Sequence, residues 1–209
     1  MSLSPWLDRL REVDVAGFYF INGSLRNGFF DSLMPFITNK WNFTAPIVLL
    51  LLYVLLFRPR RDQILAASAL AVVLLADAST SFLKDLFHRI RPCNALQQVH
   101  LLKEAVCTNS FSFPSNHASN MFAIAVFFSY NYRKLVIPCF TTAGLIGYSR
   151  IYLGAHYPTD VMAGVVWGML VGFPAAMIAE RLTRVGQVDD PIRSSEKEDQ
   201  PVSRLRSSQ

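Results

Sequence analysis

The segment 149–160 places an arginine, a histidine and an aspartate between two apolar stretches. Ionisable groups at a membrane boundary cost free energy, so they mark a functional site by default. A neutral histidine can act as a nucleophile, and a carboxylate on its far ring nitrogen fixes the tautomer and stabilises the cation formed on attack. His156 is followed four positions later by Asp160, and Pro158 suits the first turn of a helix. This spacing predicts a loop histidine oriented by a helical acid, with a simple helix-capping loop as the alternative.

A second charged group lies at the end of an earlier apolar stretch. Lys84 and Arg91 are seven residues apart, so on a helix they would lie on one face. Pro92 would then end that helix and leave Arg91 facing a loop. Two such cations could bind an anion, although basic residues also anchor the ends of membrane spans.

A third group opens the next apolar stretch. Ser115 suits a helix N-cap, where its hydroxyl would accept a hydrogen bond from a first-turn N–H. The free N–H groups and the dipole of a helix start favour phosphate binding. His117 would then be placed to protonate a leaving oxygen. Taken alone, the group could also be an ordinary capped helix with an incidental histidine.

The elements that must position these groups are membrane helices. The chain has 209 residues, of which 52% are hydrophobic, and a positive mean hydropathy. Because the apolar residues come in long runs, we expect an all-α, polytopic transmembrane bundle rather than a soluble domain. The net charge of +5 sits mostly at the ends of these runs, which indicates a bilayer and not nucleic acid as the partner. The five expected spans are about 41–57, 65–83, 118–132, 135–151 and 161–182.

The membrane domain is expected to cover residues 41–184, between two regions of different composition. Residues 1–40 mix apolar and charged side chains, which is typical of amphipathic helices in the interface. A tilted or broken sixth span over 15–37 is the alternative, because that apolar stretch is long enough but rather polar. Residues 185–209 are rich in Ser, Asp, Glu and Arg and are expected to form a disordered tail.

Basic residues in the short loops predict the orientation in an inner (plasma) membrane. They lie at three places that the positive-inside rule makes cytoplasmic: Arg58, Arg60, Arg61, Arg133, Lys134, Arg181 and Arg184. The loops holding the three chemical groups then face the periplasm. Those loops are basic too, which argues against this orientation unless their charges bind an anion.

The three groups together closely resemble the motifs of the type 2 phosphatidic acid phosphatase family, which shares its core with vanadium haloperoxidases and bacterial acid phosphatases. The first motif, Lys, six residues and Arg-Pro, corresponds to residues 84–92. The second, Pro-Ser-Gly-His, corresponds to residues 114–117, and the third, Ser-Arg, five residues, His, three residues, Asp, to residues 149–160. The resemblance covers about residues 40–183. Asn116 stands where glycine is usual, so its side chain must point away from an anion bound by the backbone.

The resemblance implies a phosphatase that needs no metal or other cofactor. His156 would attack phosphorus and form a phosphohistidine, Asp160 would orient its imidazole, and His117 would protonate the leaving oxygen. The phosphate-binding residues would be Lys84, Arg91, Ser115, Asn116 and Arg150. Asp85, His88 and Arg89 fall inside the first motif and are given no catalytic role.

The expected substrate is a lipid phosphate that arrives from the bilayer. Resemblance to small bacterial members favours undecaprenyl diphosphate, with phosphatidate, phosphatidylglycerol phosphate and the 1-phosphate of lipid A as alternatives. A non-catalytic lipid-phosphate binder or transporter of the same fold is a hypothesis from another class. It would be expected to lack the nucleophile or the acid, and both are present here.

Two cysteines lie in the loop between the first two motifs. A disulfide between Cys93 and Cys107 could form if that loop faces an oxidising compartment, and a pair of reduced thiols is the alternative. Cys139 lies inside an apolar run and is interpreted as a packing residue.

Overall fold

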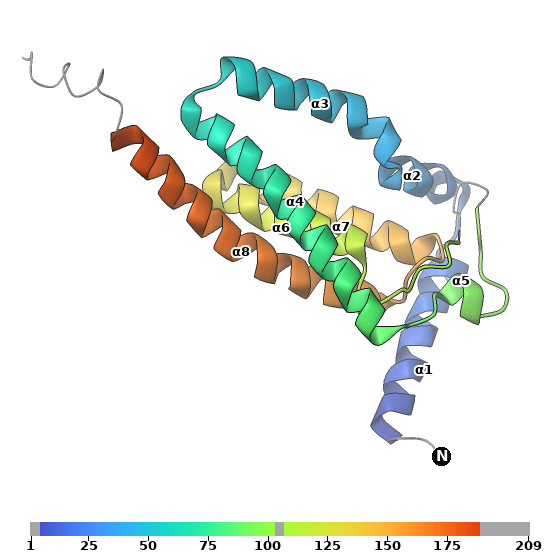
Figure 1. Ribbon diagram of the computed structural model, residues 1–209. Coiled ribbons are helices and arrows are strands. Elements are labelled where there is room, and N and C mark those ends of the chain that lie inside the picture. The colour runs from blue at the N-terminus through green and yellow to red at the C-terminus, as the bar shows by residue number, and fades with distance from the viewer. Residues whose placement is uncertain (1–4, 103–106, 189–209) are drawn as a thin grey trace, which may run out of the picture.

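The computed structural model describes residues 5–102 and 107–188, and that part of the chain is helical without strands. The prediction of an all-α membrane bundle is confirmed (Figure 1). Most of the expected C-terminal tail, 185–209, lies outside the described residues. The α-helices are α1 (Pro5–Tyr19), α2 (Gly28–Thr38), α3 (Lys40–Phe57), α4 (Arg60–Phe87), α5 (Pro92–Ala95), α6 (Asn116–Asn131), α7 (Val136–Tyr152) and α8 (Pro158–Val188). A helical turn, Phe20–Ser24, follows α1, and a 3-10 turn, Arg133–Leu135, precedes α7.

Helices α4, α6, α7 and α8 form the bundle, and α6 and α8 approach each other closely. Three glycines on one face of α8 allow this approach. A Cβ added at Gly164, Gly168 or Gly172 would collide with the carbonyl oxygen of Ser115, Ser119 or Ala123, respectively. Small residues let membrane helices gain backbone-to-backbone van der Waals contact. The apolar core beside this contact comprises Leu65, Ala69, Val72, Ala76, Ala123, Phe127, Ala176 and Ala179.

Three stretches of the described residues are long and apolar enough to cross a membrane: Lys40–Phe57, Arg60–Ala95 and Pro158–Val185. The two remaining expected spans are present as α6 and α7, with 16 and 17 residues. At 1.5 Å per residue these two helices reach only about 25 Å, less than a hydrocarbon core of about 30 Å. The sequence therefore located five helices correctly, but only three of them meet the length and composition of a span.

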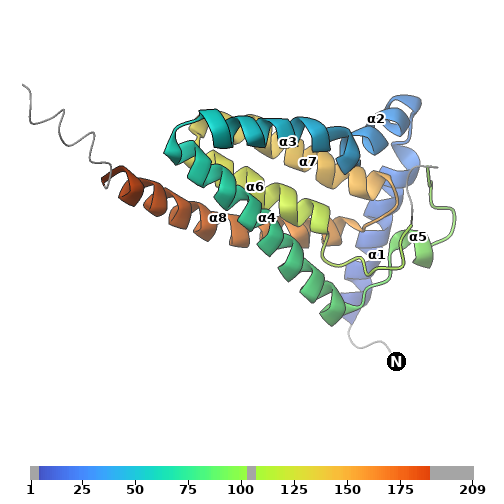
Figure 2. The ribbon, with the colours of Figure 1, turned by 45° about the horizontal axis from the view of Figure 1, so that its top comes forward.

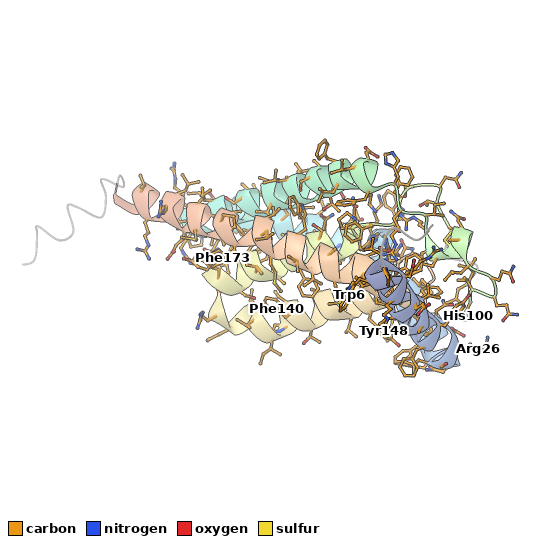
Figure 3. The ribbon with its side chains drawn as sticks, turned by 90° about the horizontal axis from the view of Figure 1, so that it is seen from below. Trp6, Arg26, His100, Phe140, Tyr148 and Phe173 are labelled. Atoms are coloured by element: carbon orange, nitrogen blue, oxygen red, sulfur yellow. A yellow bond between two sulfur atoms is a disulfide. The ribbon has the colours of Figure 1, made fainter. Side chains whose placement is uncertain are left out.

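The outer surface of the bundle is apolar, as a bilayer requires. Helix α3 has no buried residue, and it runs along the bundle in Figures 1 and 2. Phe173 of α8, whose side chain is labelled in the view from below in Figure 3, is 51% exposed.

The N-terminal region lies across the bundle instead of along it. Helix α1 is steeply inclined to α4, α6, α7 and α8 in Figures 1 and 2. Residues 15–37 do not form one continuous helix, because the chain turns after Ser24 before α2 begins, so the alternative of a sixth span stays a prediction only in its broken form. Large apolar side chains of α1 are exposed, as expected for an interfacial helix: Trp6, Leu7, Leu10 and Val13.

The basic turns gather at the end of the bundle that lies away from the three motifs (Figure 2). Arg61 Nη2 donates to the carbonyl of Asn131 at 3.3 Å, and the hydroxyl of Tyr132 donates to Asp62 at 2.6 Å. These bonds hold the start of α4 against the end of α6. The other end of the bundle combines the C-terminal ends of α4 and α7 with the N-terminal ends of α6 and α8.

We predict that Gly168→Ala lowers the melting temperature of the detergent-solubilised protein by several degrees. Its Cβ would collide with backbone that cannot move independently, and overpacking of this kind costs about 1–3 kcal/mol. Gly144→Ala on α7 is the matched control, because a Cβ there meets nothing within 4 Å. Alanine is about 1 kcal/mol better than glycine in a helix, so the control should melt at or above the wild-type temperature. Equal melting of the two variants would contradict the close packing of α6 on α8.

Candidate active site

His156 lies in the short loop between α7 and α8, as its sequence context predicted. Its side chain is 2% exposed. The loop is fixed by backbone bonds from Ala155 and His156 to the carbonyl of Arg150, at 3.0 and 3.2 Å. Gly154 has φ +76°, and a Cβ there would lie 2.8 Å from Val99. The turn therefore requires glycine both for its backbone angle and for space.

Asp160 lies in the first turn of α8 beside the histidine, again as predicted. Its Oδ2 is 3.6 Å from His156 Nδ1, which is longer than a hydrogen bond. The same oxygen accepts from the N–H of Tyr157 at 2.8 Å, and Oδ1 accepts from Arg89 Nη1 at 2.6 Å. Catalytic hydrogen bonds are often long in an empty site and shorten in the substrate complex. The carboxylate is thus held in place and ready to accept from the imidazole.

The other ring nitrogen of His156 faces a cation. Arg91 Nη1 lies 3.2 Å from Nε2, and the same guanidinium donates to the carbonyl and hydroxyl of Ser110, each at 2.8 Å. Arginine has no acceptor, so Nε2 must carry the lone pair and Nδ1 the proton. Burial, followed by the charges of Arg91, Arg150 and Lys84, lowers the pKa of His156 well below its ordinary value. A neutral imidazole with a free Nε2 is the form that can attack phosphorus.

Two further cations share this end of the bundle. Lys84 Nζ donates to the carbonyl of Phe111 at 2.8 Å. Arg150 Nη1 donates to the hydroxyl of Thr38 at 3.1 Å, while its buried Nε has no hydrogen-bond partner among the described residues. An unpaired buried guanidinium nitrogen costs free energy, so it marks a place where an anion would be bound.

One prediction about these cations was wrong. Lys84 and Arg91 do not share a helical face, because α4 ends at Phe87 and His88 adopts left-handed angles of φ 50° and ψ 30°. Arg91 is extended, and Pro92 begins the short α5 instead of ending a helix. The two cations still reach the same site, since both donate to the segment just before the second motif.

The predicted cap at Ser115 was also wrong in its details. Ser115 is the N-cap residue of α6, but its hydroxyl caps no first-turn N–H. Its own N–H donates to the carbonyl of Asp160 at 3.0 Å, so that N–H is not free for phosphate. The Ser115 hydroxyl is buried without a hydrogen-bond partner in the described chain.

Asn116 points away from the site, as its replacement of glycine required. Its Nδ2 donates to Asp77 at 2.9 Å and to Ser81 at 3.2 Å, both on α4. Asn120 adds a third bond, to the same Asp77 oxygen at 3.2 Å. The asparagine therefore ties the start of α6 to α4 and leaves the space before the helix N-terminus open.

A cavity of about 950 Å³ opens beside these groups, lined by His117 and Arg150. Its other walls come from α2, the start of α3 and the loop that holds Cys93 and Cys107. His117 is exposed towards this space, whereas His156 is buried behind it. All five predicted phosphate-binding residues lie at this end of the bundle, and of their side chains that of Arg150 lines the cavity.

Sequence reasoning gave no role to Arg89, and the structure gives it two carboxylate partners. Arg89 Nη1 bonds to Asp160, and Nη2 bonds to Asp14 of α1 at 2.5 Å. The side chain also covers the ring of Tyr157, with 4.0 Å between the guanidinium carbon and the ring centroid. A buried aspartate 75 residues earlier in the chain carries no local sequence signal for this contact.

Cys93 and Cys107 form a disulfide across 14 positions, which decides between the two alternatives that the sequence left open. Both cysteines line the cavity. The bridge therefore joins the start of α5, just after Arg91, to the segment that leads to Ser115. Cys139 is a free cysteine, half-buried on α7.

Residues 65–184 match the model of the PAP2 superfamily, which is more than half of the chain. The chain belongs to this superfamily.

Two curated relatives and a solved structure resemble most of the chain. It is 32% identical to a lipid A 4'-phosphatase of Bacteroides thetaiotaomicron, with 89% of this chain and 85% of that protein covered. It is 30% identical to the undecaprenyl-diphosphatase BcrC of Bacillus subtilis, with 72% and 75% covered. A crystal structure of a transmembrane PAP2 type phosphatidylglycerolphosphate phosphatase from Bacillus subtilis has the same fold, with a TM-score of 0.68 at 24% identity over 83% of this chain and 88% of that one. The chain is therefore a membrane lipid phosphatase of the PAP2 superfamily.

We predict that the disulfide makes only one of the three cysteines reactive. The unreduced protein, unfolded in denaturant with a maleimide, should gain one adduct by intact mass, at Cys139. Prior reduction should raise the count to three. Cys139 serves as the internal control for complete labelling. Three adducts without reductant would mean that the bridge is absent.

Proposed function

We propose that this PAP2 phosphatase cleaves a lipid phosphomonoester through a phosphohistidine formed on His156. The observation that carries the proposal is the position of Nε2, whose lone pair faces the Arg91 guanidinium at 3.2 Å while a carboxylate lies 3.6 Å from the opposite ring nitrogen. A phosphate bound by Arg91 would place its phosphorus next to that lone pair. This geometry suits in-line attack on a bound phosphoryl group.

In the first step, Nε2 of His156 bonds to phosphorus as the bond to the lipid oxygen breaks. The imidazole becomes positive, and Asp160 stabilises that charge through the Nδ1 proton. Lys84, Arg91 and Arg150 offset the charge on the non-bridging oxygens, which is the electrostatic part of catalysis. Burial, followed by the nearby cations, lowers the pKa of His117 to about 3, so His117 takes up a proton only when the anionic substrate binds. It then gives that proton to the lipid oxygen, because it lines the cavity from which the lipid leaves.

In the second step, water cleaves the phosphohistidine. His117, now neutral, takes a proton from the water as its oxygen attacks phosphorus. The bond between Nε2 and phosphorus breaks, inorganic phosphate leaves, and both histidines return to their starting forms. The same cations serve both steps, since the phosphoryl group stays beside them throughout.

We infer that the lipid is a phosphorylated glycolipid of the lipid A type. The cavity of about 950 Å³ is far larger than a phosphate, and polar side chains at α2 and α3, including Asp31, Asn39 and Lys40, form part of its wall. A sugar headgroup supplies hydroxyls for such a wall, whereas a polyprenyl chain does not. The 32% identity to a lipid A 4'-phosphatase over most of both chains supports this choice.

Undecaprenyl diphosphate, which the sequence favoured, is the second candidate. The relative named undecaprenyl-diphosphatase, at 30% identity over 72% of this chain, supports it. Its diphosphate would use the same cations, but its polyprenyl chain has no hydroxyl that could bond to the polar wall. For either lipid we propose a site on the extracytoplasmic face, because a disulfide persists in an oxidising compartment and the basic turns lie at the other end of the bundle.

We predict that His156→Asn abolishes phosphate release and that His117→Asn lowers it by about 10²–10⁴-fold, the usual contribution of a general acid. Of these two variants, only His117→Asn should still carry labelled phosphate on the protein after acid-free quenching. His88→Asn is the matched control, because His88 lies outside the cavity and its left-handed backbone suits asparagine. Wild-type turnover in His156→Asn would exclude this histidine as the nucleophile.

We predict a kcat/KM at least tenfold higher for lipid A carrying a 4'-phosphate than for undecaprenyl diphosphate, because the polar wall would bind the sugars. The measurement is inorganic phosphate released from mixed micelles. The panel also holds lipid A 1-phosphate, phosphatidate and phosphatidylglycerol phosphate. EDTA should not change the rates, since the mechanism uses no metal ion. A higher value for undecaprenyl diphosphate would select the second candidate.

A further inference from the structure

Helix α1 brings a buried carboxylate to the catalytic end of the bundle. Asp14 is only 4% exposed, although the side chains of this helix are mostly exposed. A buried carboxylate is costly unless its oxygens are bonded to charged or polar groups. All the bonds that Asp14 makes lead to the turn that begins α8, or to Arg89.

The contacts of Asp14 form a continuous path to the nucleophile. Its Oδ1 accepts from the N–H of Thr159 at 2.9 Å, and its Oδ2 accepts from the Thr159 hydroxyl at 2.6 Å. Oδ2 also bonds to Arg89 Nη2, and the other end of that guanidinium bonds to Asp160. Asp160 in turn lies beside Nδ1 of His156. One planar guanidinium therefore bridges two carboxylates, and the second of them faces the imidazole.

Packing holds α1 in the register that this path needs. Phe18 is fully buried, and its ring lies 5.8 Å from the ring of Tyr157 between centroids. A Cβ added at Gly17 would lie 3.3 Å from the Pro158 ring. Arg89 covers the Tyr157 ring from another side. Helix α1 is thus seated directly on the turn between His156 and Asp160.

We propose that Asp14 and Arg89 are positioning residues for His156, so that α1 completes the nucleophile. The proposal rests on the phosphohistidine mechanism above. If Asp160 were paired with Arg89 alone, the pair would carry no net charge and would stabilise an imidazolium poorly. With Asp14 the three groups carry a net charge of −1, so Asp160 keeps its negative character towards Nδ1. The bonds from both ends of the Arg89 guanidinium also fix the direction in which the Asp160 carboxylate points.

The test compares Asp14→Asn with the wild type in single-turnover formation of the phosphoprotein from labelled lipid phosphate. Asparagine nearly preserves the shape and removes the charge. The rate constant should fall at least tenfold with KM within twofold, because the phosphate-binding cations are untouched. Asp8→Asn is the matched control: Asp8 is exposed on the same helix, and the charge change is equal. Its rate constant should equal that of the wild type.

The shape of the time course separates positioning from simple anchoring. If Asp14 only stabilises the fold, Asp14→Asn lowers the amplitude of the phosphoprotein signal and leaves its rate constant unchanged. That result, or a wild-type time course, would overturn the proposal. Asp14→Glu, which keeps the charge, should recover part of the rate constant. A failure of the wild type itself to form phosphoprotein would refute the proposed phosphohistidine mechanism, which is a different result from a loss confined to Asp14→Asn.

A second variant tests the same path if Asp14→Asn does not fold. Arg89→Lys keeps one positive charge but cannot bridge Asp14 and Asp160 at once. Its rate constant should also fall at least tenfold. Combining it with Asp14→Glu should cost no more than the larger of the two single losses, because both act on one path. If the two single losses in the rate constant multiplied in the double variant, Asp14 would not act through Arg89.

Discussion

The site depends on an excess of buried positive charge that no carboxylate among residues 5–102 and 107–188 pairs with directly. In that part of the chain, Lys84, Arg91 and Arg150 are held by carbonyl and hydroxyl oxygens. Asp160 lies nearby, but its oxygens are taken by Arg89 and by a backbone N–H. Like charges repel strongly where water is scarce, so this arrangement is stable only with a rigid scaffold and is relieved by a bound anion. The preference for phosphate follows from that unsatisfied charge.

The same charge keeps the nucleophile in its reactive form. His156 is buried against three cations, so protonation would add a fourth positive charge in one place. The imidazole stays neutral, and attack on phosphorus creates that fourth charge only when the phosphate is there to offset it. Asp160 acts on the far nitrogen, where it can stabilise the product of attack without occupying Nε2. Binding and chemistry are thus coupled through one electrostatic balance.

Close helix packing supplies the rigidity that this balance requires. The α8 glycines bring its backbone against that of α6 from Ser115 to Ala123, so the ends of these two helices cannot separate easily. A backbone bond from Ser115 to the carbonyl of Asp160 ties the second motif to the third. The disulfide and the Asn116 bonds add two more ties around the site. The second motif is therefore fixed from three directions.

The sequence could predict where the proposed nucleophile and its acid lie because their types and spacings are local. His156, Pro158 and Asp160 fall within one turn, so loop and helix geometry follow directly from the chain. The relative position of Lys84 and Arg91 could not be predicted in the same way. It depends on His88, which has left-handed backbone angles although it is not a glycine. Arg89 and Asp14 were missed because their contact joins segments 75 residues apart. Long-range ion pairs of this kind leave no periodicity to detect.

Family similarity and the site cover different parts of the chain, and that difference bears on substrate choice. The superfamily match spans residues 65–184, which hold the nucleophile, the acid and the three cations. Asp14, the hydroxyl of Thr38 that accepts from Arg150, and much of the cavity wall lie before residue 65. The predicted boundary at residue 40 thus separates segments that meet in one site. The proposed chemistry resides in the matched part, whereas the segments before it contribute Asp14, which we propose positions the nucleophile, and part of the cavity wall.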